Sequence, residues 1–182
     1  IVGEIRGREA YVLFQAMATG HTTYSTMHAD SPQSLIRRLE NEPINVPRVM
    51  LQSLEVIAIQ TIARVKGKRV RRCKQVVEIV DIDHKTKEIL TNEVFRWDPI
   101  EDTFIYSGRS YVLEKIRASM GMTKEEMVEE IRRRVKILEW MRKEGIRSYR
   151  EVAKIVAEYA EKPEEVMKRV EEGLKKHASD KV

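Results

Sequence analysis

The sequence predicts an α/β fold followed by an all-α C-terminal part. Two observations carry this prediction. Residues 1–106 mix β-rich runs with helical runs, and residues 107–182 have the apolar spacing of helices almost throughout. A length of 182 residues suits one domain or two small ones, so we expect a domain boundary between residues 106 and 107.

The first 30 residues predict two short strands around a helix. Ile1 and Val2 are expected to end a buried strand, and residues 22–27 form a β-prone run of Thr, Tyr and Ser. Between them, residues 8–19 have helical spacing, and Gly20 is a typical helix stop. The expected apolar face of this helix consists of Val12, Leu13, Ala16 and Met17.

The rest of the first part predicts one helix and two strand pairs. Ser31 and Pro32 form an N-cap and first-turn start, and Pro43 and Pro47 break the helix that follows. Its inward residues are expected to be Leu35, Ile36 and Leu39. Residues 55–65 and 68–83 predict a hairpin that turns at Gly67. Residues 91–97 and 103–106 predict a second strand pair.

The C-terminal part shows three helix starts. Capping boxes begin at Thr123 and Ser148, each with Glu three residues later, and Pro163 opens a third helix with acidic residues behind it. Apolar residues then recur at helical spacing, which predicts a small three-helix bundle. The expected core stripes are Met127, Ile131, Val135, Leu138 and Met141; Val152, Ile155, Val156 and Tyr159; and Met167, Val170 and Leu174.

Composition narrows the function classes. Hydrophobic residues at 42% are enough for a core, and no apolar run approaches the ~20 residues of a membrane span. A lone Cys73 excludes an internal disulfide and a cysteine-based zinc site. The net charge is only +5, although residues 64–74 hold seven cations and no acid. The charge of this basic hairpin indicates contact with another subunit or partner. The second interpretation is that the hairpin binds nucleic acid through phosphate contacts. Base stacking is not expected, because no aromatic residue lies among the cations.

Two histidines, His21 and His28, stand seven residues apart around the β-prone run. Residues seven apart on a strand point to opposite faces, and no cluster of further ligands completes a metal set, so metal binding is disfavoured. Glu4 follows Ile1-Val2-Gly3, where a strand would end. Such an acid can orient water or the Mg²⁺ shell in phosphoryl transfer. No G-x-x-x-x-G-K-[ST] phosphate loop occurs in the sequence.

Four segments together resemble the secretion-type traffic ATPases, and most closely their archaeal members. These are GEIRGREA, QAMATGH, STMHADS and FRWD, and the resemblance covers residues 1 to about 97. Members of this family are the hexameric motors of type II secretion, type IV pili and the archaellum. The resemblance implies a partial RecA-like P-loop NTPase sheet with an antiparallel strand extension. It also implies that residues 1–106 are the C-terminal half of a motor domain whose phosphate loop lies upstream.

By the same resemblance, Glu4 matches the catalytic acid of the Walker B segment and His28 a phosphate-side histidine. Arg6, Glu9, His21 and Thr26 fall on matched or supporting positions, and Mg²⁺ is approached by Glu4 only through water. The implied cofactors are ATP and Mg²⁺, and the fragment alone is expected to be inactive. The implied partners are copies of itself and a membrane platform protein, with no nucleic acid, no direct membrane insertion and a cytoplasmic location at the membrane's inner face. The alternative is a nucleic-acid-binding protein that uses residues 64–74 and the C-terminal helices.

Overall fold

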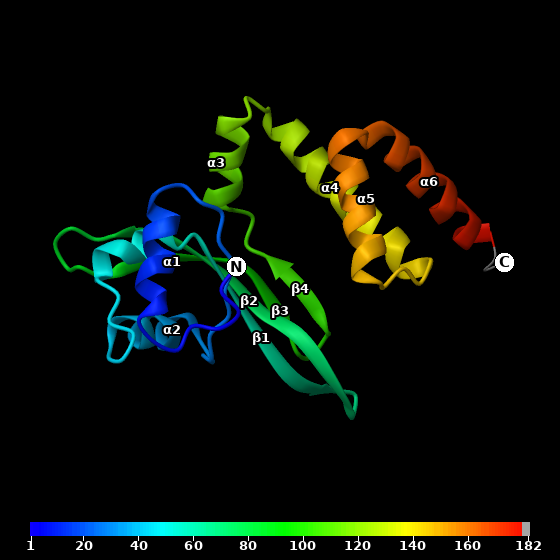
Figure 1. Cartoon of the computed structure of the whole chain (residues 1–182). Helices are drawn as coiled ribbons and strands as arrows, with labels where there is room; N and C mark the ends of the chain where they lie inside the picture. Colours follow the sequence, from blue (N-terminus) through cyan, green and yellow to red (C-terminus); the bar gives the residue numbers. More distant parts are fainter. Residues whose placement is uncertain (180–182) are drawn as a thin grey trace. The chain divides into compact units, whose positions relative to one another are not determined.

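The computed structural model describes residues 1–179, which divide into two compact units, the first Ile1–Lys115 and the second beginning at Ile116. The predicted α/β class with an antiparallel strand extension and C-terminal helices is confirmed (Figure 1). The expected domain boundary between residues 106 and 107 stays a prediction.

The first unit begins with two short helices. Helix α1 spans Glu9–Ala18, and Gly20 ends it at φ +87° while the N–H groups of Gly20 and His21 bond back into the last turn. Its buried residues are Ala10, Leu13 and Phe14. The prediction of the buried face was therefore only partly right, because Leu13 is buried but Val12 is exposed. Helix α2 spans Pro32–Glu40 and starts as predicted, because Ser31 Oγ accepts a hydrogen bond from Ser34 N–H.

A four-stranded antiparallel sheet in the order β1-β2-β3-β4 follows the 3₁₀ helix η1 (Arg48–Ser53). Its strands are β1 Val56–Val65, β2 Lys68–Ile82, β3 Ile89–Asp98 and β4 Thr103–Tyr106. Both predicted strand pairs are therefore confirmed. Ile57, Ile59 and Ile79 are buried on one face of the sheet, against Leu35 of α2.

The predicted strands at the N-terminus are largely absent. Ile1 is exposed, and residues 22–27 contribute only a single bridge, in which Ser25 runs parallel to Val2. A strand needs a partner for its N–H and C=O groups along its length. Within the described residues these two segments pair only with each other and through a single bridge, so neither forms a regular strand.

A buried carboxylate ties the sheet to the next helix, α3 (Tyr111–Ser119). Glu78 of β2 is only 2% exposed. It accepts hydrogen bonds from the hydroxyl of Ser110, the N–H groups of Tyr111 and Val112, and the side chain of Asn92. Burial alone raises the pKa of Glu78, but these bonds outweigh it and hold the pKa below its ordinary value. The negative charge therefore caps the positive end of the α3 dipole.

The second unit packs α4 (Lys124–Lys143) and α5 (Tyr149–Glu161) against α6 (Pro163–Ser179). Thr123 and Glu126 form the predicted capping box. Gly173 of α6 lies directly against the Trp140 indole, where an added Cβ would come within 2.3 Å of Nε1. The buried core consists of Ile137, Trp140, Met141, Ile155, Tyr159, Val166, Met167 and Val170.

Two predictions for this unit are wrong. Ser148 makes no side-chain cap hydrogen bond at the start of α5. The expected core stripe of α4 is also only partly buried. Met127 and Met141 are covered, whereas Ile131, Val135 and Leu138 of the expected stripe are exposed together with the neighbouring Val128, and Val156 of α5 is exposed too. This exposed α4 stripe consists of Val128, Ile131, Val135 and Leu138.

Among residues 1–179, no helix is both long and apolar enough to cross a membrane.

Candidate functional site

The carboxylate of Glu4 joins two other predicted site residues. Arg6 Nη2 donates a hydrogen bond to Glu4 Oε2 at 2.7 Å, and His28 Nε2 lies 3.3 Å from Glu4 Oε1. The structure thus brings Glu4, Arg6 and His28 together. We call these three side chains the Glu4 cluster.

Backbone contacts between two chain segments create this cluster. Val2 N–H donates to the carbonyl of Tyr24, and Ile5 N–H donates to the carbonyl of Thr26. The hydroxyl of Thr26 donates to the carbonyl of Gly3. Thr26 therefore fixes the segment before Glu4 to the segment before His28.

Glu9 shapes the turn between Glu4 and α1. Its carboxylate accepts hydrogen bonds from the N–H groups of Arg6 and Gly7. These backbone bonds, that from Arg6 first, lower the pKa of Glu9. The N-cap residue of α1, Arg8, makes no side-chain cap hydrogen bond. Glu9 instead provides an acceptor for the N–H groups of Arg6 and Gly7 just before the helix. Its contribution to the cluster is to hold the backbone of Arg6.

A residue that the sequence analysis missed completes the surroundings. Arg38 of α2 donates a hydrogen bond from Nη1 to the backbone carbonyl of His28. The hydrogen bond from Arg6 is the main cause that lowers the pKa of Glu4, and the charges of Arg6, His28 and Arg38 add to it. The sequence did hold a signal for Arg38, because the helix that carries it starts only a few residues after His28.

His21 takes a different place. It lies at the end of α1, where its Nδ1 is 3.1 Å from the hydroxyl of Thr19. None of the contacts described for residues 1–179 joins His21 to Glu4. His21 and His28 line the same groove, but only His28 contacts Glu4 among the described residues.

An open groove of about 1250 Å³ runs beside the cluster, and Glu4 and His28 lie in its wall. Its lining includes residues 20–29, the start of β1, and Leu13 and Phe14 of α1. Strand β1 is an edge strand of its sheet, and within residues 1–179 the backbone of residues 22–28 pairs only with that of residues 2–5. Two incompletely paired backbone edges therefore line the same apolar groove.

A family model described as "Type II/IV secretion system protein" matches residues 1–168. The chain belongs to this family. Its relatives include three uncharacterized proteins of Methanocaldococcus jannaschii. One is 44% identical over 161 residues, which are 88% of this chain and 59% of the relative. A second is 39% identical over 89% of this chain and 30% of the relative, and a third is 30% identical over 80% and 20%.

This type II/IV secretion system protein thus spans between one fifth and three fifths of the length of these relatives. The match extends through both compact units, including most of the C-terminal helices. The helices therefore belong to the family's shared sequence, beyond the residues that carried the resemblance.

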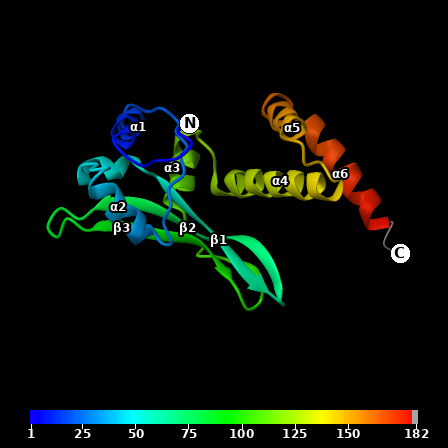
Figure 2. The same cartoon turned by 60° about the horizontal axis from the view of Figure 1, so that its bottom comes forward.

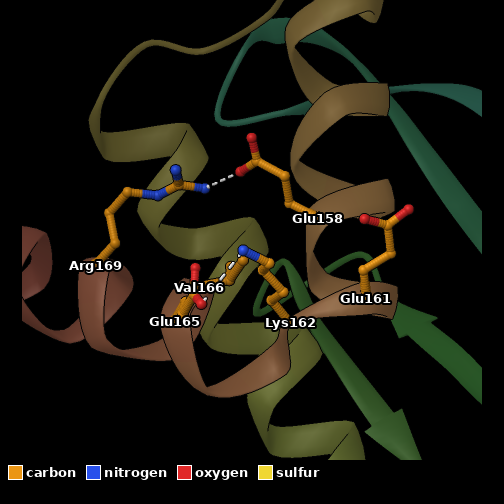
Figure 3. A pocket seen from close by; sticks show the side chains of 6 residues that line it. All are labelled: Glu158, Glu161, Lys162, Glu165, Val166 and Arg169. Carbon is orange, nitrogen blue, oxygen red and sulfur yellow. Dashed lines mark hydrogen bonds and ion pairs between the residues drawn. The ribbon is translucent and has the colours of Figure 1, made fainter.

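Two further kinds of site can be assessed in the described part of this family member, a metal site and a charged cleft. In the described residues, no group of three or more His, Cys, Asp or Glu side chains gathers as metal ligands would. A charged cleft between α5 and α6 is closed by its own ion pairs. Figure 3 shows Arg169 reaching Glu158, at 2.7 Å, and Lys162 reaching Glu165, at 3.5 Å. Opposite charges that already satisfy one another leave little to bind a ligand.

Proposed function

We propose that this chain is part of the motor domain of a hexameric ATPase that drives protein secretion or the assembly of a pilus-like or archaellum filament. The observation that carries the proposal is the Glu4 cluster in the wall of a groove with two open backbone edges. Membership of the type II/IV secretion system family supports it.

Glu4 suits the task of orienting an attacking water. Arg6 keeps the pKa of Glu4 low, so the carboxylate is ionised at neutral pH and accepts hydrogen bonds only. His28 lies on the opposite oxygen of the same carboxylate, where an imidazole can bond either to Glu4 or to a phosphate oxygen. Phosphoryl transfer depends mainly on such positioning and on stabilising charge.

The residues of the cluster fit an indirect contact with Mg²⁺. Magnesium is usually held by one or two carboxylates, phosphate oxygens and several waters. Glu4 offers one carboxylate, and we propose that it meets the water shell of the ion. ATP and Mg²⁺ are the proposed cofactors, and a phosphate loop outside this sequence would cradle the phosphates. The groove has room for added chain beside β1, and we propose that the rest of the motor sheet enters there.

The proposed partners are further copies of the same chain and a membrane platform protein, on the cytoplasmic side of the membrane. A ring of subunits would convert ATP turnover into movement of the platform. By itself, the 182-residue chain is proposed to be inactive, because its sequence has no G-x-x-x-x-G-K-[ST].

The test is ATP turnover in a full-length polypeptide that contains this sequence. Glu4→Gln removes the charge but keeps the shape, so we expect kcat to fall by about 100-fold or more while ATP still binds. His28→Ala is expected to lower kcat by at least ~10-fold. Glu93→Gln, an exposed carboxylate on β3, is the control. Turnover by Glu4→Gln within a few-fold of the unsubstituted protein would rule out the proposed role.

A further inference from the structure

The outer ends of β1 and β2 form a two-stranded ribbon around the turn at Lys66 and Gly67. Both turn residues have positive φ, +46° and +78°, which gives the tight two-residue turn favoured in hairpins. Figures 1 and 2 show this ribbon running out beyond α1 and α2 of the same unit. We call residues 61–72 the basic ribbon.

One face of the basic ribbon carries three arginines side by side. Arg64 and Arg69 are direct cross-strand partners, and Arg71 follows two residues after Arg69 on the same face. Like charges directly opposite each other destabilise a strand pair. No hydrogen bond or ion pair described for residues 1–179 engages these three guanidinium groups. Within the described residues, the repulsion between these arginines is therefore not offset by an acidic side chain.

The other face shows how the chain neutralises such a charge elsewhere. Arg72 donates two hydrogen bonds of 2.7 Å to the carboxylate of Asp102. Lys66 and Lys68 at the turn have no ion pair among the described residues. Five cations without an ion pair among the described residues therefore surround the end of the ribbon: Arg64, Lys66, Lys68, Arg69 and Arg71. The charge of Lys66 also acts on Asp102.

We propose that the basic ribbon binds the phosphate headgroups of an anionic lipid bilayer. The three arginines share one face and the two lysines lie at the turn, so a planar surface laid along that face can meet the arginines and, at its end, the lysines. Clusters of four to eight Lys and Arg residues are typical of sites for anionic lipids. Ile62, which is 54% exposed and pairs with Arg71, adds an aliphatic side chain among the arginines.

Nucleic acid fits the ribbon less well. Strands β1 and β2 contain no Phe, Tyr or Trp, so bases would find no stacking surface, and only phosphate contacts would remain. The proposal rests on the ribbon alone and is independent of ATP hydrolysis.

The experiment is flotation of the purified 182-residue chain with vesicles. Vesicles that contain phosphatidylglycerol are expected to carry the chain at low salt, and vesicles of pure phosphatidylcholine are not. Binding should disappear at about 0.5 M salt, because ions screen charges at exposed sites. Arg64→Gln with Arg69→Gln and Arg71→Gln is expected to reduce binding by at least ~10-fold.

The matched control is Lys124→Gln with Arg142→Gln and Lys143→Gln, which removes the same charge from exposed sites on α4. It should bind almost as the unsubstituted chain does. The ribbon variant should melt at the same or a higher temperature, because a like-charge pair has been removed. Equal binding by the two triple variants would overturn the proposal, as would absence of binding to phosphatidylglycerol. Tighter, ribbon-dependent binding to mixed-sequence duplex DNA at the same salt would favour nucleic acid instead.

Discussion

The guanidinium of Arg38 holds the backbone carbonyl of His28, the residue whose imidazole faces Glu4. One hydrogen bond therefore links helix α2 to the candidate site. Because it acts on the backbone, it sets the position from which the imidazole reaches Glu4. Arg38 is thus a positioning residue.

We predict that Arg38→Gln in the full-length polypeptide lowers kcat for ATP by about 10-fold and changes KM by less than ~2-fold. If Arg38 acts through His28, the double variant with His28→Ala should turn over no more slowly than His28→Ala alone. Arg37→Gln, one residue away on the same helix, is the control. Additive losses in the double variant would show that Arg38 acts elsewhere.

The Arg72–Asp102 pair predicts a specific dependence of stability on pH. The hydrogen bonds from Arg72, and then that from Trp97 Nε1, lower the pKa of Asp102 to about 2. In the unfolded chain the pKa of Asp102 is about 4. A carboxyl group whose pKa is lower in the folded state stabilises the fold at pH values above about 4. This contribution disappears as the pH falls toward 2.

Asp102→Asn should therefore unfold at lower urea concentration than the unsubstituted chain at pH 7. The difference should shrink between about pH 4 and pH 2. Urea midpoints measured across this range provide the test, with Glu101→Gln as the adjacent control. A difference that stays constant down to pH 2 would show that the charge of Asp102 contributes nothing.

The buried carboxylate of Glu78 predicts a larger loss. Glu78→Gln would place an NH₂ group among the donors of Ser110, Tyr111 and Val112. We expect the free energy of unfolding to fall by about 2 kcal/mol, because buried donors lose their charged acceptor. Urea unfolding measures this change, and Glu93→Gln on the neighbouring strand should cost less than ~0.5 kcal/mol. An effect as small as that of the control would contradict the capping role.

The sequence predicted the features that depend on near neighbours. Three of these features each depend on residues only a few positions apart: the hairpin at Gly67, the start of α2 at Ser31 and the capping box at Thr123. The meeting of Glu4 with His28 came from the family resemblance. The contact of Glu78 with Ser110 joins segments 32 residues apart through side chains of ordinary type. Local patterns carry no information about such pairs.

The faces of the helices were harder to predict for a related reason. Helix α4 has apolar residues on more than one side, and spacing alone does not tell which side a neighbour covers. Trp140 and Ile137 take the covered side, so Val135 and Leu138 remain half exposed or more. Ser148 has the right neighbour in Glu151, yet it makes no side-chain cap hydrogen bond.

The exposed α4 stripe has a practical consequence for work with the helices. Val128, Ile131, Val135 and Leu138 recur with alternating steps of three and four, the repeat of a coiled-coil seam. A peptide cut to residues 116–179 would therefore carry a ready seam for its own copies. Its helical signal and melting temperature would rise with peptide concentration, as they do for zippers, so values measured at one concentration would overstate the stability of the lone bundle.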